Sequence, residues 1–191
     1  MARTIGQYVA TDSGGVARVL WGQEWGQSCG PACCYMVVCS ASQSTGAGGE
    51  AFMRSLAVKH GATLFDMIAG AGTYVSQLAD ILEDNGLKVN SAQYAVGEWK
   101  AKIAAASERK PIIFHVQWAA RDAKSQWVGN GGHFVVCVGL SRGGAVILDP
   151  WYGLLEMPLD ALPVYNTNMQ SVDLNKAQTA GYLSGWLVQV L

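Results

Sequence analysis

The order of hydrophobic patterns along the chain is what most limits its fold. Apolar residues at the three- and four-residue spacing of a helix face come first, and short β-rich runs follow after Pro111. Helices are expected near residues 29–40, 50–59, 73–86 and 98–107, and strands near residues 112–116, 132–140, 144–149, 154–157 and 182–191. Helices followed by strands are typical of an α+β domain with an antiparallel sheet. Neither an internal repeat nor a linker divides residues 1–191, so a single domain is predicted.

Charged residues are few and scattered. They make up 14% of the chain, against about 25% in a typical domain, and the formal net charge is −1. Because no basic stripe could neutralise phosphates, nucleic acid is not an expected partner. The apolar runs are also far shorter than the roughly 20 residues that a membrane span needs. The sequence therefore indicates no nucleic-acid partner and no membrane partner.

The N-terminus and the cysteines bear on where the chain is made. The first residues form no apolar segment of the kind found in secretory signals, so we expect synthesis in the cytoplasm without one. Four of the five cysteines lie between Cys29 and Cys39, whereas a disulfide framework normally spreads them, which favours a reducing environment. No Cys-x-x-Cys pair or Cys/His set has the spacing of a metal site, and we predict neither a metal nor a cofactor.

The segment from Gln23 to Ala32 contains the candidate nucleophile. Cys29 stands directly before Gly-Pro and opens a predicted helix, where backbone N–H groups lack intrahelical partners. The helix dipole favours a thiolate there, and the free N–H groups can hold an oxyanion. Gln23, six residues upstream, could supply a second oxyanion donor. The alternative is that Cys29 is simply a small buried residue, as we expect for the other cysteines of this helix.

His133 is the candidate general base. It follows two glycines at the start of a predicted strand, and Gly132 would leave room for a substrate backbone. A hairpin through residues 141–144 would bring His133 beside Asp149, whose carboxylate could orient the imidazole. The register stays open, since a plain two-residue turn leaves the pair out of line, and Asp149 could be only a turn residue before proline. His115, inside a strand, is expected to be a structural residue.

Together these segments resemble the papain-like cysteine peptidases. The greatest similarity is to the branch that contains bacterial double-glycine leader peptidases and secreted effector proteases. It rests on five stretches in matching order: Gln23–Ala32, residues 72–87, residues 110–116, Gly132–Val136 and Leu148–Pro150. The resemblance covers about residues 23–159. It implies a papain-like fold, in which an N-terminal helical part with the nucleophile packs on a C-terminal antiparallel sheet.

The resemblance also implies roles for four residues. Cys29 would be the nucleophile, His133 the general base and acid, Asp149 the residue that orients His133, and Gln23 the oxyanion-hole donor. The implied activity is that of a cysteine endopeptidase that cleaves a protein or peptide substrate by acyl transfer, next to glycine and at Gly-Gly sites above all. A further expectation is a bacterial effector or toxin, delivered into a target cell by a specialised secretion system and matched by a cognate immunity protein.

Three alternatives stay open at this point. The chain could be a bacteriocin-type leader-processing peptidase, which has the same chemistry and a different substrate. It could be an acyltransferase or deamidase that uses the same Cys-His-Asp site, because amide hydrolysis and acyl transfer share an acyl-enzyme. It could also be a non-enzymatic peptide-binding module. The presence of all four candidate residues favours an enzyme.

Overall fold

The chain opens with a β-hairpin that the sequence patterns did not predict. In the computed structural model, which describes residues 4–44, 48–65, 70–165 and 179–191, β1 (Gly6–Thr11) pairs antiparallel with β2 (Ala17–Gly22). The turn between them contains Gly15 at a φ of +84°, a conformation that glycine adopts without steric cost. The hairpin leads directly to the loop before Cys29, so it fixes where the candidate nucleophile begins its helix.

Four helices form close to the predicted positions. They are α1 (Cys29–Ser42), α2 (Gly49–Lys59), α3 (Val75–Asp84) and α4 (Val96–Ala104). Helix α1 is buried over most of its length because α2, α3, β2 and β5 (Trp127–Ser141) all pack against it. This explains why α1 is apolar on several faces and has no continuous polar face.

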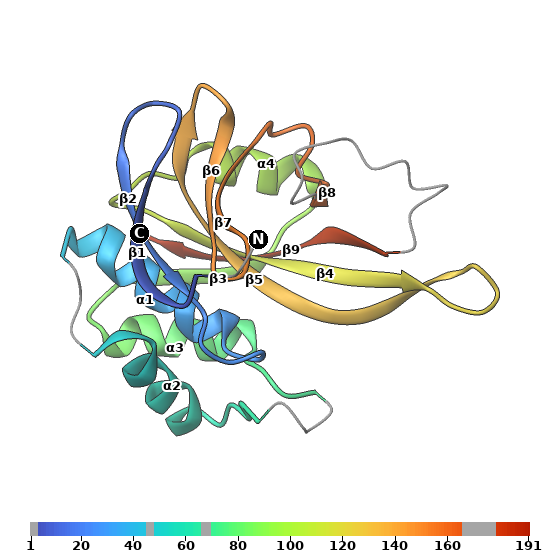
Figure 1. Cartoon of the computed structure of the whole chain (residues 1–191), viewed down its shortest axis with the longest axis horizontal. Coiled ribbons are helices and arrows are strands. Elements are labelled where there is room, and N and C mark those ends of the chain that lie inside the picture. Colours follow the sequence, from blue (N-terminus) through green and yellow to red (C-terminus); the bar gives the residue numbers. More distant parts are fainter. Residues whose placement is uncertain (1–3, 45–47, 66–69, 166–178) are drawn as a thin grey trace.

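The remaining strands form one antiparallel sheet in the order β3-β9-β4-β5-β6-β7, with β8 paired to β9. Besides β5, its strands are β3 (Val89–Gln93), β4 (Ile112–Arg121), β6 (Gly144–Asp149), β7 (Gly153–Met157), β8 (Val164–Tyr165) and β9 (Thr179–Val190). The predicted α+β class and antiparallel sheet are confirmed, while β3 and β8 were not predicted. The last strand of the chain, β9, lies between β3 and β4, inside the sheet (Figure 1).

Each face of the sheet has its own hydrophobic core. Side chains of α1, α2 and α3 pack on one face against residues such as Ile113 and Val136. On the other face, Trp99 and Ile103 of α4 pack against Phe114 and other strand residues. Figure 1 shows α1, α2 and α3 on one side of the sheet and α4 on the other. The predicted packing of an N-terminal helical part on the sheet is therefore confirmed. Within the described residues, no helix is long and apolar enough to cross a membrane.

Candidate active site

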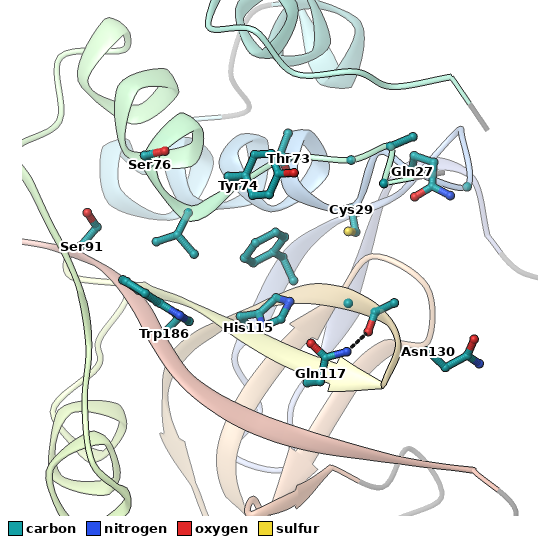
Figure 2. Close-up of a pocket in the computed structure, with 18 residues that line it drawn as sticks. Gln27, Cys29, Thr73, Tyr74, Ser76, Ser91, His115, Gln117, Asn130 and Trp186 are labelled. Atoms are coloured by element: carbon teal, nitrogen blue, oxygen red, sulfur yellow. Dashed lines mark hydrogen bonds between the residues drawn. The ribbon is translucent and has the colours of Figure 1, made fainter. Parts of the chain in front are cut away.

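Cys29 is the first residue of α1, as the sequence predicted. Ser28 precedes it as the N-cap residue, but its hydroxyl bonds to the backbone of Trp25 rather than to the helix. The first N–H groups of α1 therefore receive no side-chain cap, and they lack intrahelical acceptors as in any helix. Cys29 is half-buried and lines a groove, with its sulfur facing the open space (Figure 2).

The structure brings His133 and Asp149 into direct contact. His133 Nε2 lies 2.9 Å from Asp149 Oδ1, and both residues are buried. With Nε2 engaged, Nδ1 is the ring nitrogen left for another partner. The Cys29 side chain is within hydrogen-bonding range of the imidazole, so the three predicted residues meet in the order thiol, imidazole, carboxylate.

A β-bulge determines that His133 and Asp149 share a face of the sheet. The turn after Ser141 has two residues, and the pairs from Ser141↔Gly144 to Gly139↔Val146 keep its simple register. Val138 is then an extra residue, and the register moves by one to Cys137↔Ile147. The shift brings Asp149 level with Val135, which shares a face with His133, instead of Val136, which faces the opposite way. The sequence left this register open.

The Asp149 carboxylate accepts four hydrogen bonds. Besides His133, Oδ1 accepts the backbone N–H groups of Trp151 at 2.7 Å and Tyr152 at 3.0 Å, and Oδ2 accepts the Tyr165 hydroxyl at 2.6 Å. Burial raises the pKa of Asp149, but the charge and hydrogen bond of His133 and the other donors outweigh it and hold that pKa below its usual value. Sequence reasoning missed Tyr165, because no local pattern marks a tyrosine that contacts Asp149 across the sheet.

The charge state of His133 follows from its neighbours. Burial lowers the pKa of His133, but the negative charge and hydrogen bond of Asp149, together with the Cys29 side chain, raise it to about 10. The indole of Trp118 covers the imidazole in a stacked arrangement, with ring centroids 6.4 Å apart. At neutral pH His133 is therefore an imidazolium, held by a buried carboxylate on one side and facing the Cys29 side chain on the other.

The other four cysteines are buried and belong to the core. Cys33 donates to the carbonyl of Phe134 at 3.1 Å, and Cys34 contacts the carbonyl of Leu78. Burial raises the pKa of all four thiols, to about 11 for Cys137. Cys29 alone among the described cysteines is open to the groove, and the prediction that the other cysteines of α1 are core residues is confirmed.

Gln23 lies beside the site but uses its amide differently from the predicted role. Its Nε2 donates to the carbonyls of Trp25 at 2.7 Å and Gly26 at 3.0 Å, while Oε1 is buried without a partner among the described residues. Exchanging Oε1 and Nε2 of Gln23 would bring an oxygen against two carbonyl oxygens, and oxygens of this kind only accept hydrogen bonds. The two carbonyls therefore fix which amide atom is the nitrogen. Both N–H groups hold the loop before Cys29, and the oxyanion-hole role of Gln23 stays a prediction.

A buried glutamate fixes the same loop from α2. Glu50 accepts the indole N–H of Trp21 and the backbone N–H of Glu24, both at 2.9 Å, and pairs with Arg54 at 2.7 Å. The backbone N–H of Gln23 also donates to Pro150, the residue after Asp149, at 2.9 Å. These contacts connect the segment before Cys29 to the turn that holds Asp149.

The groove beside Cys29 has a volume of about 1010 Å³, enough for several residues of an extended peptide. Tyr74 and Thr73 lie on its helical wall, and His115 and Trp186 lie on its sheet wall (Figure 2). Gly30, the residue after the candidate nucleophile, packs against this helical wall. A Cβ there would come within 2.0 Å of Thr73 Oγ1.

No group of three or more histidine, cysteine, aspartate or glutamate side chains in the described part of the chain is arranged to hold a metal ion. The fold and the site thus define an α+β protein whose buried imidazole–carboxylate pair faces a cysteine at a helix N-terminus.

The comparisons with known proteins find matches among solved structures. No family model matches the chain, and no curated protein matches it. Among solved structures, the chain is similar to a double glycine motif protease from an AMS/PCAT transporter, solved in complex with the leader peptide. That match has a TM-score of 0.46 and 14% identity, and it covers 97% of this chain and 99% of the other. The neighbour is of the kind that the sequence resembles, but so distant a likeness carries no functional argument, and function is argued from the site.

Proposed function

We propose that the protein is a cysteine peptidase. The observation that carries this proposal is the buried His133–Asp149 pair, which faces Cys29 at the first turn of α1, beside a groove of peptide size. A thiol is a strong nucleophile as its anion, and a cation beside it together with a helix N-terminus favours that form. The same arrangement stabilises the oxyanion that forms during attack on a carbonyl.

The geometry supports a two-step acyl transfer. The Cys29 sulfur attacks the peptide carbonyl carbon, and the resulting oxyanion is stabilised by the free N–H groups at the start of α1. His133 gives a proton to the leaving amine, the C–N bond breaks, and a thioester forms on Cys29. Neutral His133 then takes a proton from water as the water attacks the thioester, which releases the acid and restores the Cys29 thiolate and the His133 imidazolium. Asp149 stabilises the imidazolium whenever His133 is charged.

For the substrate, we propose cleavage next to glycine, with Gly-Gly sites preferred. The support is the resemblance of the Gln23–Ala32 and Gly132–Val136 segments to double-glycine peptidases. A role as a delivered bacterial effector or toxin, with a cognate immunity protein, stays a prediction of the same resemblance. Expression in a target cell with and without the Cys29→Ala change tests it, because a toxin of this kind loses its effect with the nucleophile.

Thiol labelling tests the nucleophile without any knowledge of the substrate. Brief treatment with iodoacetamide at pH ~6, followed by mass spectrometry, is expected to modify Cys29 well ahead of the four buried thiols. The His133→Ala variant serves as the matched comparison and is expected to label more slowly at Cys29. Equal labelling of all five cysteines in the folded wild type would contradict the assignment.

Cleavage itself is tested by mapping new N-termini in a proteome exposed to the wild type or to Cys29→Ala. We expect new termini at glycine-containing sites with the wild type alone. Modified amides without new termini would instead identify a transferase or deamidase.

A further inference from the structure

The groove has a second histidine on its sheet wall, and sequence reasoning took it for a structural residue. His115 lies on β4 directly opposite Phe134 of β5, one residue from His133. It is half-buried, lines the same groove as Cys29, and points from the sheet toward the open space (Figure 2). It has no carboxylate partner among the described residues, so its surroundings differ from those of His133.

A strand irregularity places a serine against the His115 ring. The pairing of β4 with β9 is interrupted between Phe114 and Val116, so His115 faces Ser184 instead of a regular ladder partner. Ser184 Oγ lies 2.9 Å from His115 Nδ1 and donates to the His115 carbonyl at 3.3 Å. The same oxygen accepts the backbone N–H of Trp186 at 3.3 Å. Bulges of this kind often redirect side chains next to active sites.

These contacts favour one tautomer of the His115 ring. A hydroxyl has one hydrogen to donate and two lone pairs to accept. If the hydrogen of Ser184 is donated to the His115 carbonyl, Nδ1–H donates to Oγ and both contacts are satisfied, whereas donation from Oγ to Nδ1 satisfies the shorter contact alone. The other nitrogen, Nε2, is then a bare acceptor, and no described residue donates to it.

The bare nitrogen is held at the groove beside the candidate nucleophile. A Cβ on Gly132 would lie 2.3 Å from Nε2, so the absence of a side chain at Gly132 makes room for this ring. Gly132 was expected to leave space for a substrate backbone, and in the structure it accommodates His115. Burial, assisted by the positive charge of His133, lowers the pKa of His115, which is therefore neutral at neutral pH.

We propose that His115 is a specificity-determining residue whose Nε2 accepts a hydrogen bond from an N–H or O–H group of the bound peptide. This inference rests on the proposed peptidase function and names a feature of its substrate: a donor at the position that faces His115. A buried acceptor left unpaired is costly, so a peptide without the donor is bound less well in the transition state. The donor is either a main-chain amide or a polar side chain, and the test separates these two sources.

Cleavage of a peptide library that keeps Gly-Gly and varies the flanking positions tests the inference. Four proteins are compared: wild type, His115→Phe, His115→Gln and Ser184→Ala. We expect His115→Phe to lower kcat/KM about tenfold, the effect of losing one hydrogen bond of this kind, and His115→Gln, which offers an amide oxygen, to restore part of it. Ser184→Ala removes the contact with Nδ1, so the ring can place its hydrogen on Nε2. We expect the kcat/KM of this variant to lie between those of His115→Phe and His115→Gln.

The pattern of loss identifies the donor. A drop that is uniform across the library indicates a main-chain amide, and a drop confined to peptides with a donor side chain at one position indicates that side chain. Either pattern supports the inference. Equal kcat/KM values for wild type and His115→Phe on every peptide of the library would overturn it while leaving the peptidase assignment intact. No cleavage by the wild type would overturn the proposed function and, with it, the substrate role of His115.

A second measurement tests the basis of the inference without substrate. The ¹⁵N chemical shifts of the His115 ring in the wild-type protein are expected to show a protonated Nδ1 and a bare Nε2 near neutral pH. Ser184→Ala should shift this balance. A ring protonated at Nε2 in the wild type would overturn the inference, even if the His115 variants fold poorly.

Discussion

Two buried aspartates, Asp12 and Asp149, occupy similar local structures with different consequences. Asp12 follows β1 and Asp149 is the last residue of β6, and each carboxylate accepts two backbone N–H groups of the residues after it. For Asp12 these are Gly14 at 2.9 Å and Val16 at 3.0 Å. The pKa of each carboxyl is held below its ordinary value by these bonds and by a basic partner. The two sites differ in that partner: Arg18 pairs with Asp12 at 2.7 Å, whereas His133 pairs with Asp149 at 2.9 Å.

The difference explains why one turn is structural and the other chemical. A guanidinium group does not exchange protons in ordinary protein chemistry, so the pair of Arg18 with Asp12 can only fix the β1–β2 hairpin, to which Glu108 adds a second ion pair. His133 can gain and lose a proton, and its second nitrogen faces the Cys29 side chain. A buried aspartate at a turn is therefore no sign of catalysis by itself. What matters is whether its partner titrates and what that partner faces.

Removal of the thiol is the largest expected effect. Cys29→Ala should reduce peptide cleavage by at least 10³-fold, because no other described cysteine reaches the groove. The measurement is kcat/KM on a Gly-Gly peptide, with thermal unfolding as the control for folding. Cys33→Ala is the matched variant and should keep its activity. Activity that survives in Cys29→Ala would move the nucleophile elsewhere.

Replacing each of the two aspartates by asparagine tests the comparison between the two turns directly. Asp149→Asn removes the charge that stabilises the His133 imidazolium, and we expect a loss of roughly 10² or more in kcat/KM. Asp12→Asn should leave kcat/KM within about threefold. It should lower the free energy of unfolding by about 3 kcal/mol, because Arg18 stays buried with one partner fewer. If both variants lose activity equally, the distinction between the two turns fails.

The Tyr165 hydroxyl should have a smaller effect. Tyr165→Phe removes the 2.6 Å hydrogen bond to Asp149 Oδ2, so the pKa of Asp149 should rise toward its ordinary value. We expect kcat/KM to fall about tenfold and its acid limb to move to higher pH. Tyr152→Phe is the matched control, since the Tyr152 contact with Asp149 is made by its backbone N–H. Identical pH profiles for the two variants would exclude a role for the Tyr165 hydroxyl.

A separate effect is expected on the pH dependence of stability. The pKa of His133 rises from 6.5 in the unfolded chain to about 10 in the folded protein, so the folded state holds its proton more tightly. The stabilisation is complete below pH 6.5 and is lost as the pH rises toward 10. Denaturant unfolding at several pH values between 6.5 and 9 should show stability falling in the wild type, and a shallower fall in His133→Gln. The Arg18→Met variant should keep the slope of the wild type.

The parts of the site that depend on local sequence could be predicted. Cys29 stands at a helix start marked by Gly-Pro, so periodicity and turn residues locate it. The glycines before His133 predicted a strand start, whereas in the structure β5 already begins at Trp127 and His133 lies in its middle, because glycine also occurs inside this long strand. The fold class follows from the same patterns, because helical and strand spacings differ. The insertion of β9 between β3 and β4 does not follow from them, since it depends on long-range pairing.

The parts that depend on distant contacts could not be predicted. Tyr165 contacts Asp149 across the sheet, and the Ser184 hydroxyl that orients His115 is 69 residues away from it in sequence. The β1–β2 hairpin was missed because its exposed side carries apolar residues such as Val9, which blur the alternation of a half-buried strand. For Gln23, sequence indicated a place near Cys29 but not that its amide would bind the loop carbonyls.

The extra residue at Val138 has a consequence for how this domain can change in length. Side chains in a strand alternate, so adding or removing one residue within the paired strands between His133 and Asp149 would turn the imidazole and the carboxylate to opposite faces. A change of two residues in the same hairpin would keep them on one face and only slide them along the strands. Related sequences that keep the pair should therefore place odd changes in length in the turn at residues 142–143, or compensate an odd change within the strands with a second bulge.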